Sequence, residues 1–207
     1  MSIKAVAFDI DGTLYNFKYL RRQFVKISRL HPFRMNSFFK ARKNVRDLTK
    51  NRTEEKLSRS EFLELQTESV HKKPGYFDII YTLLRKNRKF EIYDGVDEFL
   101  SLLRNRGIKT ATLSDFPVET KLDELGLSSY FDVRLSAEDC GFLKPNPKAF
   151  SYLLSHLDVK SDECIYIGDS YTKDKKGAED FGMRGLLLGQ DFNSYRELID
   201  RIDDLIK

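Results

Sequence analysis

The chain has 207 residues, enough for one domain or for one domain that carries a small second one. Hydrophobic residues make up 41% and charged residues 33%, with 16 Phe and 10 Tyr, which gives ample material for a core and favours a soluble protein. No stretch approaches the about 18 apolar residues needed to cross a bilayer, and no signal-peptide pattern precedes the first apolar run. We therefore expect no membrane partner and a cytoplasmic location, with Cys140 and Cys164 as reduced thiols, since they match no metal-binding spacing.

The first apolar run, residues 4–8, ends in two carboxylates two residues apart, Asp9 and Asp11, and then Gly12. The run predicts a strand buried on both faces, typical of the centre of a parallel sheet, and Gly12 permits a sharp turn where it ends. Ligands of open α/β sheets bind beyond this end of the strands. Carboxylates at i and i+2 face the same side and repel each other unless a proton or a cation such as Mg²⁺ lies between them. One can then act as nucleophile and the other as general acid and base; the alternative is a pair of surface acids.

Residues 17–88 differ in character from this first stretch. They hold helix formers with apolar residues at three- and four-residue spacing, interrupted by His31-Pro32 and by Lys73-Pro74-Gly75. We predict about four helices here, among them residues 17–30 and 76–87. Residues 18–59 contain 14 Lys and Arg against three acidic residues, although the whole chain has a net charge of only +4. This asymmetry indicates two parts of the chain with different roles.

From Ile92 onward, strand-like and helix-like segments alternate with short links. An amphipathic helix that contains Val96 and Leu103 ends at Gly107. Further strands are expected at 108–113, 132–135, 164–167 and 185–188, and further helices at 121–125, 150–157, 177–181 and 195–206. This order predicts an α/β fold with a doubly wound parallel sheet. We expect an α/β core domain of residues 1–16 and 89–207, interrupted after its first strand by a helical domain of residues 17–88.

Polar residues follow three of the later strands or the loops after them. Ser114 and Asp115 close the strand at 108–113, and the alternative for them is a polar turn. Lys144 precedes Pro145, which holds the lysine extended, so that its ammonium can offset nearby acids and hold a phosphate; the alternative is a solvated surface charge. Asp169 closes the strand at 164–167, and Asp174 lies where the next helix begins, as a helix cap or beside a metal site.

Taken in order, these segments resemble the four motifs of the haloacid dehalogenase-like (HAD) hydrolases. The motifs are Asp9-Ile10-Asp11-Gly12-Thr13-Leu14, then Ser114, then Lys144-Pro145, then Gly168-Asp169 with Asp174. The likeness covers residues 1–16 and about 92–207 through these motifs. It covers residues 17–88 only through their placement, which resembles a helical cap inserted between the first and second motifs. Asp115 departs from the Asn that is commoner after the second motif.

The resemblance implies a Rossmann-like HAD core and a Mg²⁺-dependent phosphatase that passes through an aspartyl-phosphate. It implies that Asp9 is the nucleophile and that Asp11 protonates the leaving oxygen and then activates water. Since a halide leaves without a proton, an acid at position 11 argues against dehalogenation. The implied phosphate-binding residues are Gly12, Ser114, Asp115 and Lys144. The implied metal ligands are Asp9, Asp11, Asp169 and Asp174.

The implied substrate is a small phosphorylated metabolite, such as a nucleotide, a sugar phosphate or an organic-acid phosphate. A phosphomutase on the same core is the alternative, because it differs mainly in how the cap excludes water. The basic stretch 18–59 has three interpretations: attraction of an acidic substrate, binding of nucleic acid or another polyanion by a catalytically weak relative, or a solvated helix face. The first uses Arg21, Arg22, Lys26, Arg42 and Lys43. The sequence does not define the leaving group or the oligomeric state.

Overall fold

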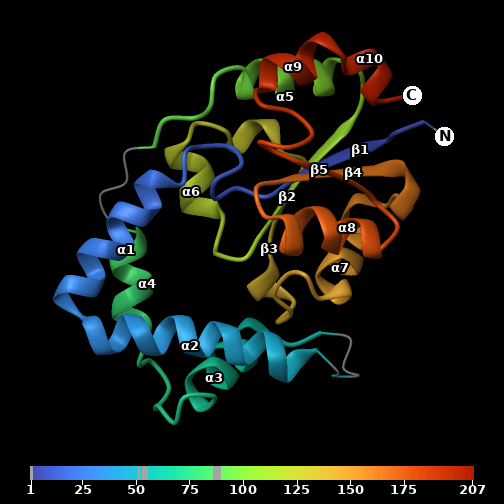
Figure 1. Ribbon diagram of the computed structural model, residues 1–207. Coiled ribbons are helices and arrows are strands. Elements are labelled where there is room, and N and C mark those ends of the chain that lie inside the picture. Colours follow the sequence, from blue (N-terminus) through green and yellow to red (C-terminus); the bar gives the residue numbers. More distant parts are fainter. Residues whose placement is uncertain (1, 51, 53–55, 86–89) are drawn as a thin grey trace.

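The computed structural model describes residues 2–50, 52, 56–85 and 90–207. In these residues, five strands form one sheet in the order β3-β2-β1-β4-β5, with every neighbouring pair parallel (Figure 1). The predicted doubly wound α/β sheet is confirmed, with β1 at its centre. The strands are Ala5–Phe8 (β1), Lys109–Ser114 (β2), Val133–Ser136 (β3), Cys164–Gly168 (β4) and Arg184–Leu187 (β5).

Helices cover both faces of the sheet, because alternate residues of β1 point to opposite sides. Val6 and Phe8 join one hydrophobic cluster, and Ala5 and Ala7 join the other. The first cluster is covered by α5 (Val96–Asn105), α6 (Glu119–Glu124), α9 (Tyr195–Asp200) and α10 (Ile202–Leu205). The second is covered by α7 (Pro147–Leu157) and α8 (Lys176–Asp180). The two faces are thus both buried, as expected for a parallel sheet.

The final helix differs from its prediction. A single helix was expected at 195–206, and the structure has α9 and α10 with a break at Arg201, whose φ and ψ are −113° and 20°. The hydrophobic pattern cannot reveal the break, because Leu198 before it and Ile202 and Leu205 after it are all buried in the same cluster. Arg201 also donates a hydrogen bond to the Asp191 carbonyl (2.7 Å).

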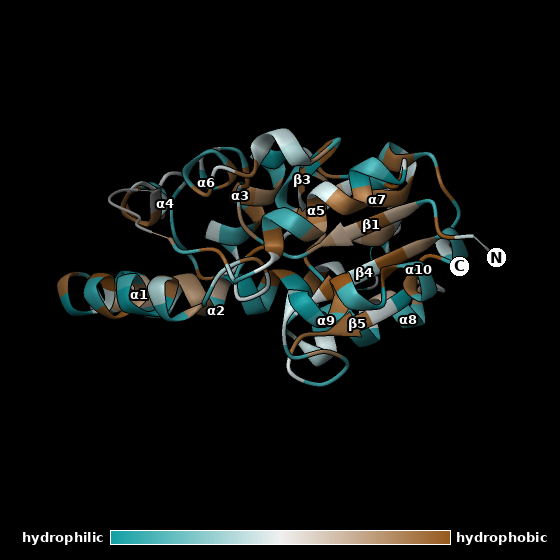
Figure 2. Ribbon diagram, turned by 90° about the horizontal axis from the view of Figure 1, so that it is seen from above, coloured by the Kyte–Doolittle hydropathy of each residue, from teal (hydrophilic) through white to brown (hydrophobic). Residues whose placement is uncertain are grey.

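Residues 17–88, here called the helical segment, hold α1 (Lys18–Leu30), α2 (Pro32–Thr49), α3 (Arg59–Glu68) and α4 (Asp78–Arg85). The helix predicted at 76–87 begins at Asp78, and residues 86 and 87 lie outside the described residues. Figures 1 and 2 show α1 and the start of α2 well to one side of the sheet. The segment has a hydrophobic cluster of its own, which includes Leu20, Ile27, Met35, Phe38, Phe77 and Ile80. The division into two domains at residues 16 and 89 stays a prediction.

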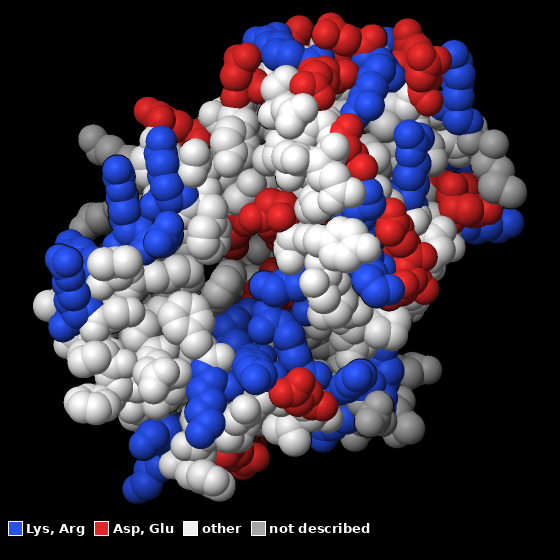
Figure 3. All heavy atoms as spheres, viewed as in Figure 1, with Lys and Arg blue, Asp and Glu red and all other residues white. Residues whose placement is uncertain are grey.

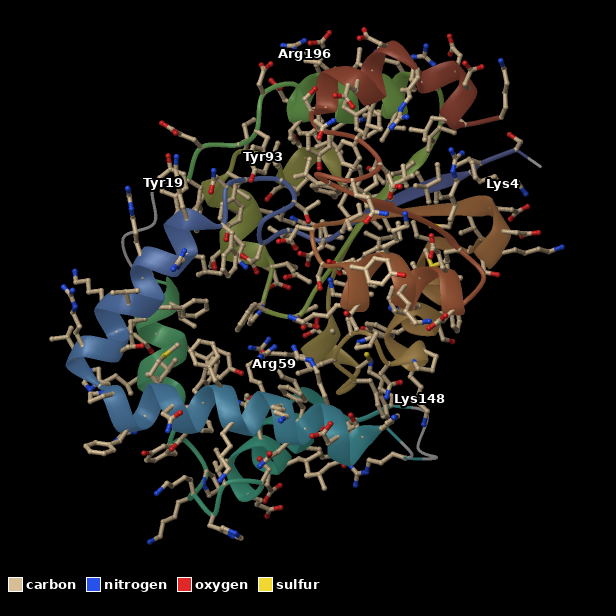
Figure 4. The ribbon with its side chains drawn as sticks, in the orientation of Figure 1. Lys4, Tyr19, Arg59, Tyr93, Lys148 and Arg196 are labelled. Carbon is tan, nitrogen blue, oxygen red and sulfur yellow. The ribbon has the colours of Figure 1, made fainter. Side chains whose placement is uncertain are left out.

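The chain leaves the core and returns to it at adjacent points. Tyr15 forms an antiparallel bridge with Ile92, and the Tyr93 N–H donates to the Leu14 carbonyl (2.9 Å). Tyr19, at the start of α1, donates its hydroxyl to Glu91 (2.5 Å). Figure 4 shows Tyr19 and Tyr93 near the place where the chain leaves the core and returns to it. The helical segment is therefore attached through two neighbouring stretches of chain.

A buried ion pair forms a second link between the helical segment and the core. Glu138, in the turn after β3, accepts hydrogen bonds from Arg42 of α2 (2.6 Å) and from the Tyr81 hydroxyl of α4 (3.0 Å). The side chains of Arg42 and Glu138 are 4% and 0% exposed, so solvent does not screen their charges. Arg59 of α3 adds a longer contact to Glu138 (3.4 Å), and Figure 4 shows it between the helical segment and the core.

We expect Glu138→Gln to lower the free energy of unfolding by about 3–5 kcal/mol, because it leaves the Arg42 guanidinium buried without a carboxylate. Urea unfolding of the wild-type protein and of the Glu138→Gln variant measures this difference. The double variant Glu138→Gln/Arg42→Met removes both charges and is expected to recover part of the loss. If the double variant lost as much free energy of unfolding as Glu138→Gln and Arg42→Met lose together as single variants, the pairing would be contradicted.

Both cysteines are buried and unpaired. Burial raises the pKa of the Cys140 thiol to about 11 and that of Cys164 to about 12, so both stay protonated at neutral pH. Among the described residues, none of the helices combines the length and the apolar character needed to cross a membrane. The cytoplasmic location stays a prediction.

Candidate active site

Three carboxylates meet at the carboxyl end of the sheet. Asp9 directly follows β1, and Asp169 directly follows the neighbouring strand β4, with Phe8 and Ile167 in register. Asp174 belongs to the turn after β4. One oxygen from each of Asp9, Asp169 and Asp174 lies within 4.8 Å of the other two. The structure thus brings together three of the four metal ligands expected from the sequence.

Lys144 lies inside this acid cluster. Its ammonium donates to Asp9 Oδ1 (2.8 Å), to Asp174 Oδ1 (2.7 Å) and to the Tyr166 hydroxyl (2.9 Å), and its side chain is 2% exposed. Burial would lower the pKa of Lys144, but Asp174 and Asp9 raise it well above the usual value, so the ammonium stays charged. Lys144 therefore offsets the negative charge of the cluster.

The carboxylates nevertheless remain crowded. Burial, together with Asp174 and Asp11, raises the pKa of Asp9 to about 8, although Lys144 opposes this shift. Burial and Asp174 raise the pKa of Asp169 to about 6. The Lys144 ammonium is shared by the two buried carboxylates Asp9 and Asp174, and the more exposed Asp169 lies beside them. The cluster can therefore accommodate a further cation.

Asp11 was expected among the metal ligands, but in the structure its carboxylate contacts a lysine. Its two carboxylate oxygens accept hydrogen bonds from Lys121 Nζ of α6 (2.7 and 2.6 Å), and one also accepts from Ser114 (3.3 Å). The Tyr15 hydroxyl donates to the same carboxylate. Burial alone would raise the pKa of Asp11, but Lys121 and these hydrogen bonds lower it. The structure thus holds Asp11 ionised and outside the group of three acids.

Sequence reasoning missed Lys121, although the chain contains a signal for it. Lys121 lies on the apolar stripe of α6 with Val118, Leu122 and Leu125, all of which are buried. A lysine on such a stripe is buried and needs a counter-charge. The spacing could have indicated an acidic partner, but it could not indicate that the partner is Asp11.

Gly12 is required by its surroundings. Its φ of +94° lies in the left-handed region, and a Cβ on it would lie 2.2 Å from Asp169 Oδ2. The loop after β1 can therefore approach the acid after β4 only with glycine at this position. This places Gly12 at the site, in the loop that carries both candidate catalytic acids.

Asp174 does not cap a helix, which was one of its two expected roles. The residue at the start of the turn Tyr171–Lys175 is Ser170, whose hydroxyl accepts from the Lys173 N–H (3.4 Å). Asp174 lies within that turn, buried, with one oxygen on Lys144 and the other on the Ser170 N–H (2.9 Å). Its carboxylate is held toward the acid cluster by its own backbone turn.

Asp115 was expected among the phosphate-binding residues, which stays a prediction, and the structure shows which groups contact its carboxylate. Its Oδ2 accepts from Arg46 (2.6 Å), and its Oδ1 accepts from the Lys144 N–H (3.0 Å). Burial opposes ionisation, yet Arg46, Lys144 and Arg42 lower the pKa of Asp115 to about 2. An ionised carboxylate has no proton to donate, so Asp115 could act on a bound anion only through its cationic and backbone partners. In the structure, Asp115 holds the Arg46 guanidinium and the backbone N–H of Lys144 in place.

These groups line one cleft between the core and the helical segment, with about 840 Å³ of empty volume that includes open solvent. Figure 3 shows Lys and Arg gathered in a hollow on this face, next to acidic side chains. The core contributes Asp9, Asp11, Ser114, Asp115, Phe116, Lys144, Asp169, Ser170, Lys173 and Asp174. The helical segment contributes Phe17, Phe24, Phe39, Arg42 and Arg46.

The basic stretch therefore reaches the cleft only in part. Of the five basic residues singled out from the sequence, Arg42 alone lines it. The other four, Arg21, Arg22, Lys26 and Lys43, are exposed and do not line it. Arg46, which the sequence did not single out, lies one helical turn after Arg42 and lines the cleft beside it.

The residues present fit a divalent magnesium ion. Mg²⁺ prefers a few carboxylate oxygens and keeps other positions for water and phosphate oxygens. Asp9, Asp169 and Asp174 offer three such oxygens at one point that is open to the cleft. The raised pKa values of Asp9 and Asp169 indicate excess negative charge that a divalent cation would offset.

The fold and the site define a protein of the α/β class whose acidic side chains lie at the carboxyl ends of parallel strands. The family model of the haloacid dehalogenase-like hydrolases matches residues 3–182. The chain belongs to this family, as the four motifs indicated.

Several proteins similar to this chain are named as phosphatases or hydrolases. The glyceraldehyde 3-phosphate phosphatase of Methanopyrus kandleri is 31% identical, over 98% of this chain and 90% of that protein. The haloacid dehalogenase-like hydrolase domain-containing protein 3 of Bos taurus is 36% identical, but the match spans only 48% of this chain and 40% of that protein. The crystal structure of a HAD phosphatase from Thermococcus onnurineus has the same fold, with a TM-score of 0.60 at 23% identity over 97% of this chain and 98% of that one.

Proposed function

We propose that the protein is a Mg²⁺-dependent phosphatase that hydrolyses a small phosphomonoester through an aspartyl-phosphate intermediate. The observation that carries this proposal is the convergence of Asp9, Asp169 and Asp174 around Lys144 in an open cleft. A relative named glyceraldehyde 3-phosphate phosphatase that matches nearly the whole chain supports it.

In the first step, a carboxylate oxygen of Asp9 attacks phosphorus and the bond to the leaving oxygen breaks. Lys144 holds the Asp9 side chain through Oδ1, which leaves Oδ2 for the attack. Mg²⁺, held by Asp9, Asp169, Asp174 and the carbonyl of Asp11, would screen the nucleophile from the anionic substrate. Ser114 and Lys144, with N–H groups of the loop at Gly12, stabilise the phosphoryl oxygens.

Asp11 is proposed to protonate the leaving oxygen and then to take a proton from the water that hydrolyses the intermediate. Its contacts with Lys121 and Tyr15 support the second of these roles directly, because an ionised carboxylate accepts the proton. The protonated form needed in the first step requires the contact with Lys121 to loosen. Lys121 is thus proposed as a positioning residue for Asp11.

The helical segment is proposed to act as a cap domain of residues 17–88 over a core of residues 1–16 and 89–207. Phe24 and Phe39, from α1 and α2, line the cleft opposite the acids, which supports a role in covering the leaving group. The attachment through Tyr15 and Ile92 would let the segment move as a unit if the ion pairs of Arg42 with Glu138 and of Arg46 with Asp115 separate.

The test is release of inorganic phosphate from 4-nitrophenyl phosphate and from a panel of phosphorylated metabolites, with Mg²⁺ and with EDTA. We expect Mg²⁺-dependent release. A phosphomutase would instead convert a sugar phosphate to its isomer without free phosphate. Absence of both activities in the folded protein would overturn the proposal.

The metal site has an expected pH dependence. Protons compete with Mg²⁺ for Asp9 and Asp169, whose pKa values in the metal-free protein are about 8 and about 6. We expect Mg²⁺ to raise the melting temperature more at about pH 8 than at about pH 5, relative to EDTA. Asp169→Asn, which removes one ligand, is expected to reduce the rise at the higher pH. A rise that is equal at both pH values would contradict the site.

A further inference from the structure

We propose that Arg46 and Lys173 form a second anion-binding subsite in the cleft, which recognises a carboxylate or a phosphate on the leaving group of the substrate. The inference rests on the proposed phosphatase function and names its substrate class: phosphomonoesters that carry a second acidic group. It depends on the contacts, the charge balance and the position of these two side chains.

Arg46 is fixed, but part of its guanidinium remains available. Its Nη2 donates to Asp115 Oδ2 (2.6 Å), and its Nε donates to the Lys144 carbonyl (3.1 Å). The remaining nitrogen, Nη1, has no hydrogen bond to any residue that the structure describes. The side chain is 26% exposed and lines the cleft. A guanidinium held in place in this way can bind an anion without first losing much conformational freedom.

Arg46, Lys173 and Asp115 form an ion-paired group with one positive charge in excess, although Lys173 also interacts with Asp169. Among the described residues, Asp115 is the one carboxylate in an ion pair with both Arg46 (2.6 Å) and Lys173, whose ammonium lies 3.9 Å from the same oxygen. The Lys173 side chain is 46% exposed and also lines the cleft. Arg42 does not add to the excess, because Glu138 neutralises it. One carboxylate between two cations thus leaves room for a second anion.

The position of the pair suits a leaving group and not the reacting phosphate. Lys144, whose carbonyl accepts from Arg46, has its ammonium on Asp9 at the acid cluster. Arg46 belongs to α2 of the helical segment, whereas Lys173 belongs to the turn after β4 that also carries Asp174. The subsite therefore lies where the two parts of the cleft meet, beside the acids. Figure 3 shows basic side chains in this hollow.

A purely structural role is the alternative: Arg46 and Lys173 would only hold α2 against the core through Asp115. The two roles differ in what they predict for substrates. A structural role changes the rates of all substrates together, whereas an anion subsite changes the ratio between acidic and neutral leaving groups.

The experiment compares kcat/KM, with Mg²⁺, for two matched pairs of substrates. The carboxylate pair is 3-phosphoglycerate and glycerol 3-phosphate, and the phosphate pair is glucose 1,6-bisphosphate and glucose 6-phosphate. We expect the wild-type protein to prefer the acidic member of at least one pair by about tenfold or more, as befits a charge-assisted hydrogen bond. The pair with the larger preference shows whether the second group is a carboxylate or a phosphate.

Arg46→Gln and Lys173→Gln are each expected to lower this preference by about tenfold. Lys43→Gln is the matched control, because it removes the same charge from the exposed side of α2 and leaves the cleft intact. If Arg46→Gln fails to fold, Lys173→Gln still tests the subsite, since that side chain is nearly half exposed.

Two results would overturn the inference: no preference for either acidic member, or variants that lower both members of a pair equally. Failure of the proposed function is distinguishable from both. In that case the wild-type protein releases no phosphate from any substrate, 4-nitrophenyl phosphate included.

Discussion

Asp9→Asn is expected to abolish phosphate release, with a fall in turnover of at least about ten-thousandfold, because the amide cannot attack phosphorus. The fold is expected to persist. Burial and Asp174 raise the pKa of Asp9 to about 8, so the charge that the amide removes is one that the metal-free site disfavours. An amide of the same shape therefore costs little stability.

The measurement is phosphate release from 4-nitrophenyl phosphate with Mg²⁺, together with thermal unfolding of each protein. Asp200→Asn is the matched control, since it makes the same change at an exposed residue of α9. Full activity of a folded Asp9→Asn variant would rule out the covalent mechanism.

Lys144→Met is expected to lower the free energy of unfolding by about 3–5 kcal/mol at about pH 8 without metal, and to abolish activity. The Lys144 ammonium is buried and hydrogen-bonded to Asp9 and Asp174, so its removal leaves two carboxylates facing each other. Without Lys144, which holds the pKa of Asp9 down against burial, the folded-state pKa of Asp9 rises further. Groups with a raised folded-state pKa stabilise the fold at low pH and lose that contribution as the pH rises through the folded-state pKa. The loss is therefore expected to be smaller at about pH 5.

Urea unfolding in EDTA at the two pH values measures this loss. The double variant Lys144→Met/Asp174→Asn removes one of the opposed carboxylates and is expected to regain stability relative to Lys144→Met alone. Equal losses at both pH values, or a double variant less stable than Lys144→Met, would show that charge is not the cause.

Local patterns made much of the fold predictable. The apolar run before Asp9 and the one before Asp169 are short, continuous and followed by glycine or acid, which is the pattern of a buried parallel strand. Strands of one parallel sheet end at the same edge, so residues far apart in the sequence were expected to meet there. Asp9, Asp169 and Lys144 do lie together in the structure.

The partners of these residues were not predictable, because they depend on packing between distant elements. Nothing near Lys121 in the sequence indicates that α6 places it on Asp11, 110 residues away. Likewise, Asp115 belongs to a motif that suggested phosphate binding. Its contact with Arg46 was not predictable, because α2 brings that arginine from a segment that carries none of the motifs.

The bridge between Tyr15 and Ile92 holds the two ends of the helical segment together at the edge of the core. A shorter or longer segment between these two residues changes one loop closure, whose entropic cost grows slowly with length, but it must also supply partners for the core carboxylates Glu138 and Asp115. The register of β1 with its neighbours does not depend on what the segment contains. The alignment of the acids after β1 and β4 therefore rests on strand pairing within the core, whatever the length of chain between Tyr15 and Ile92.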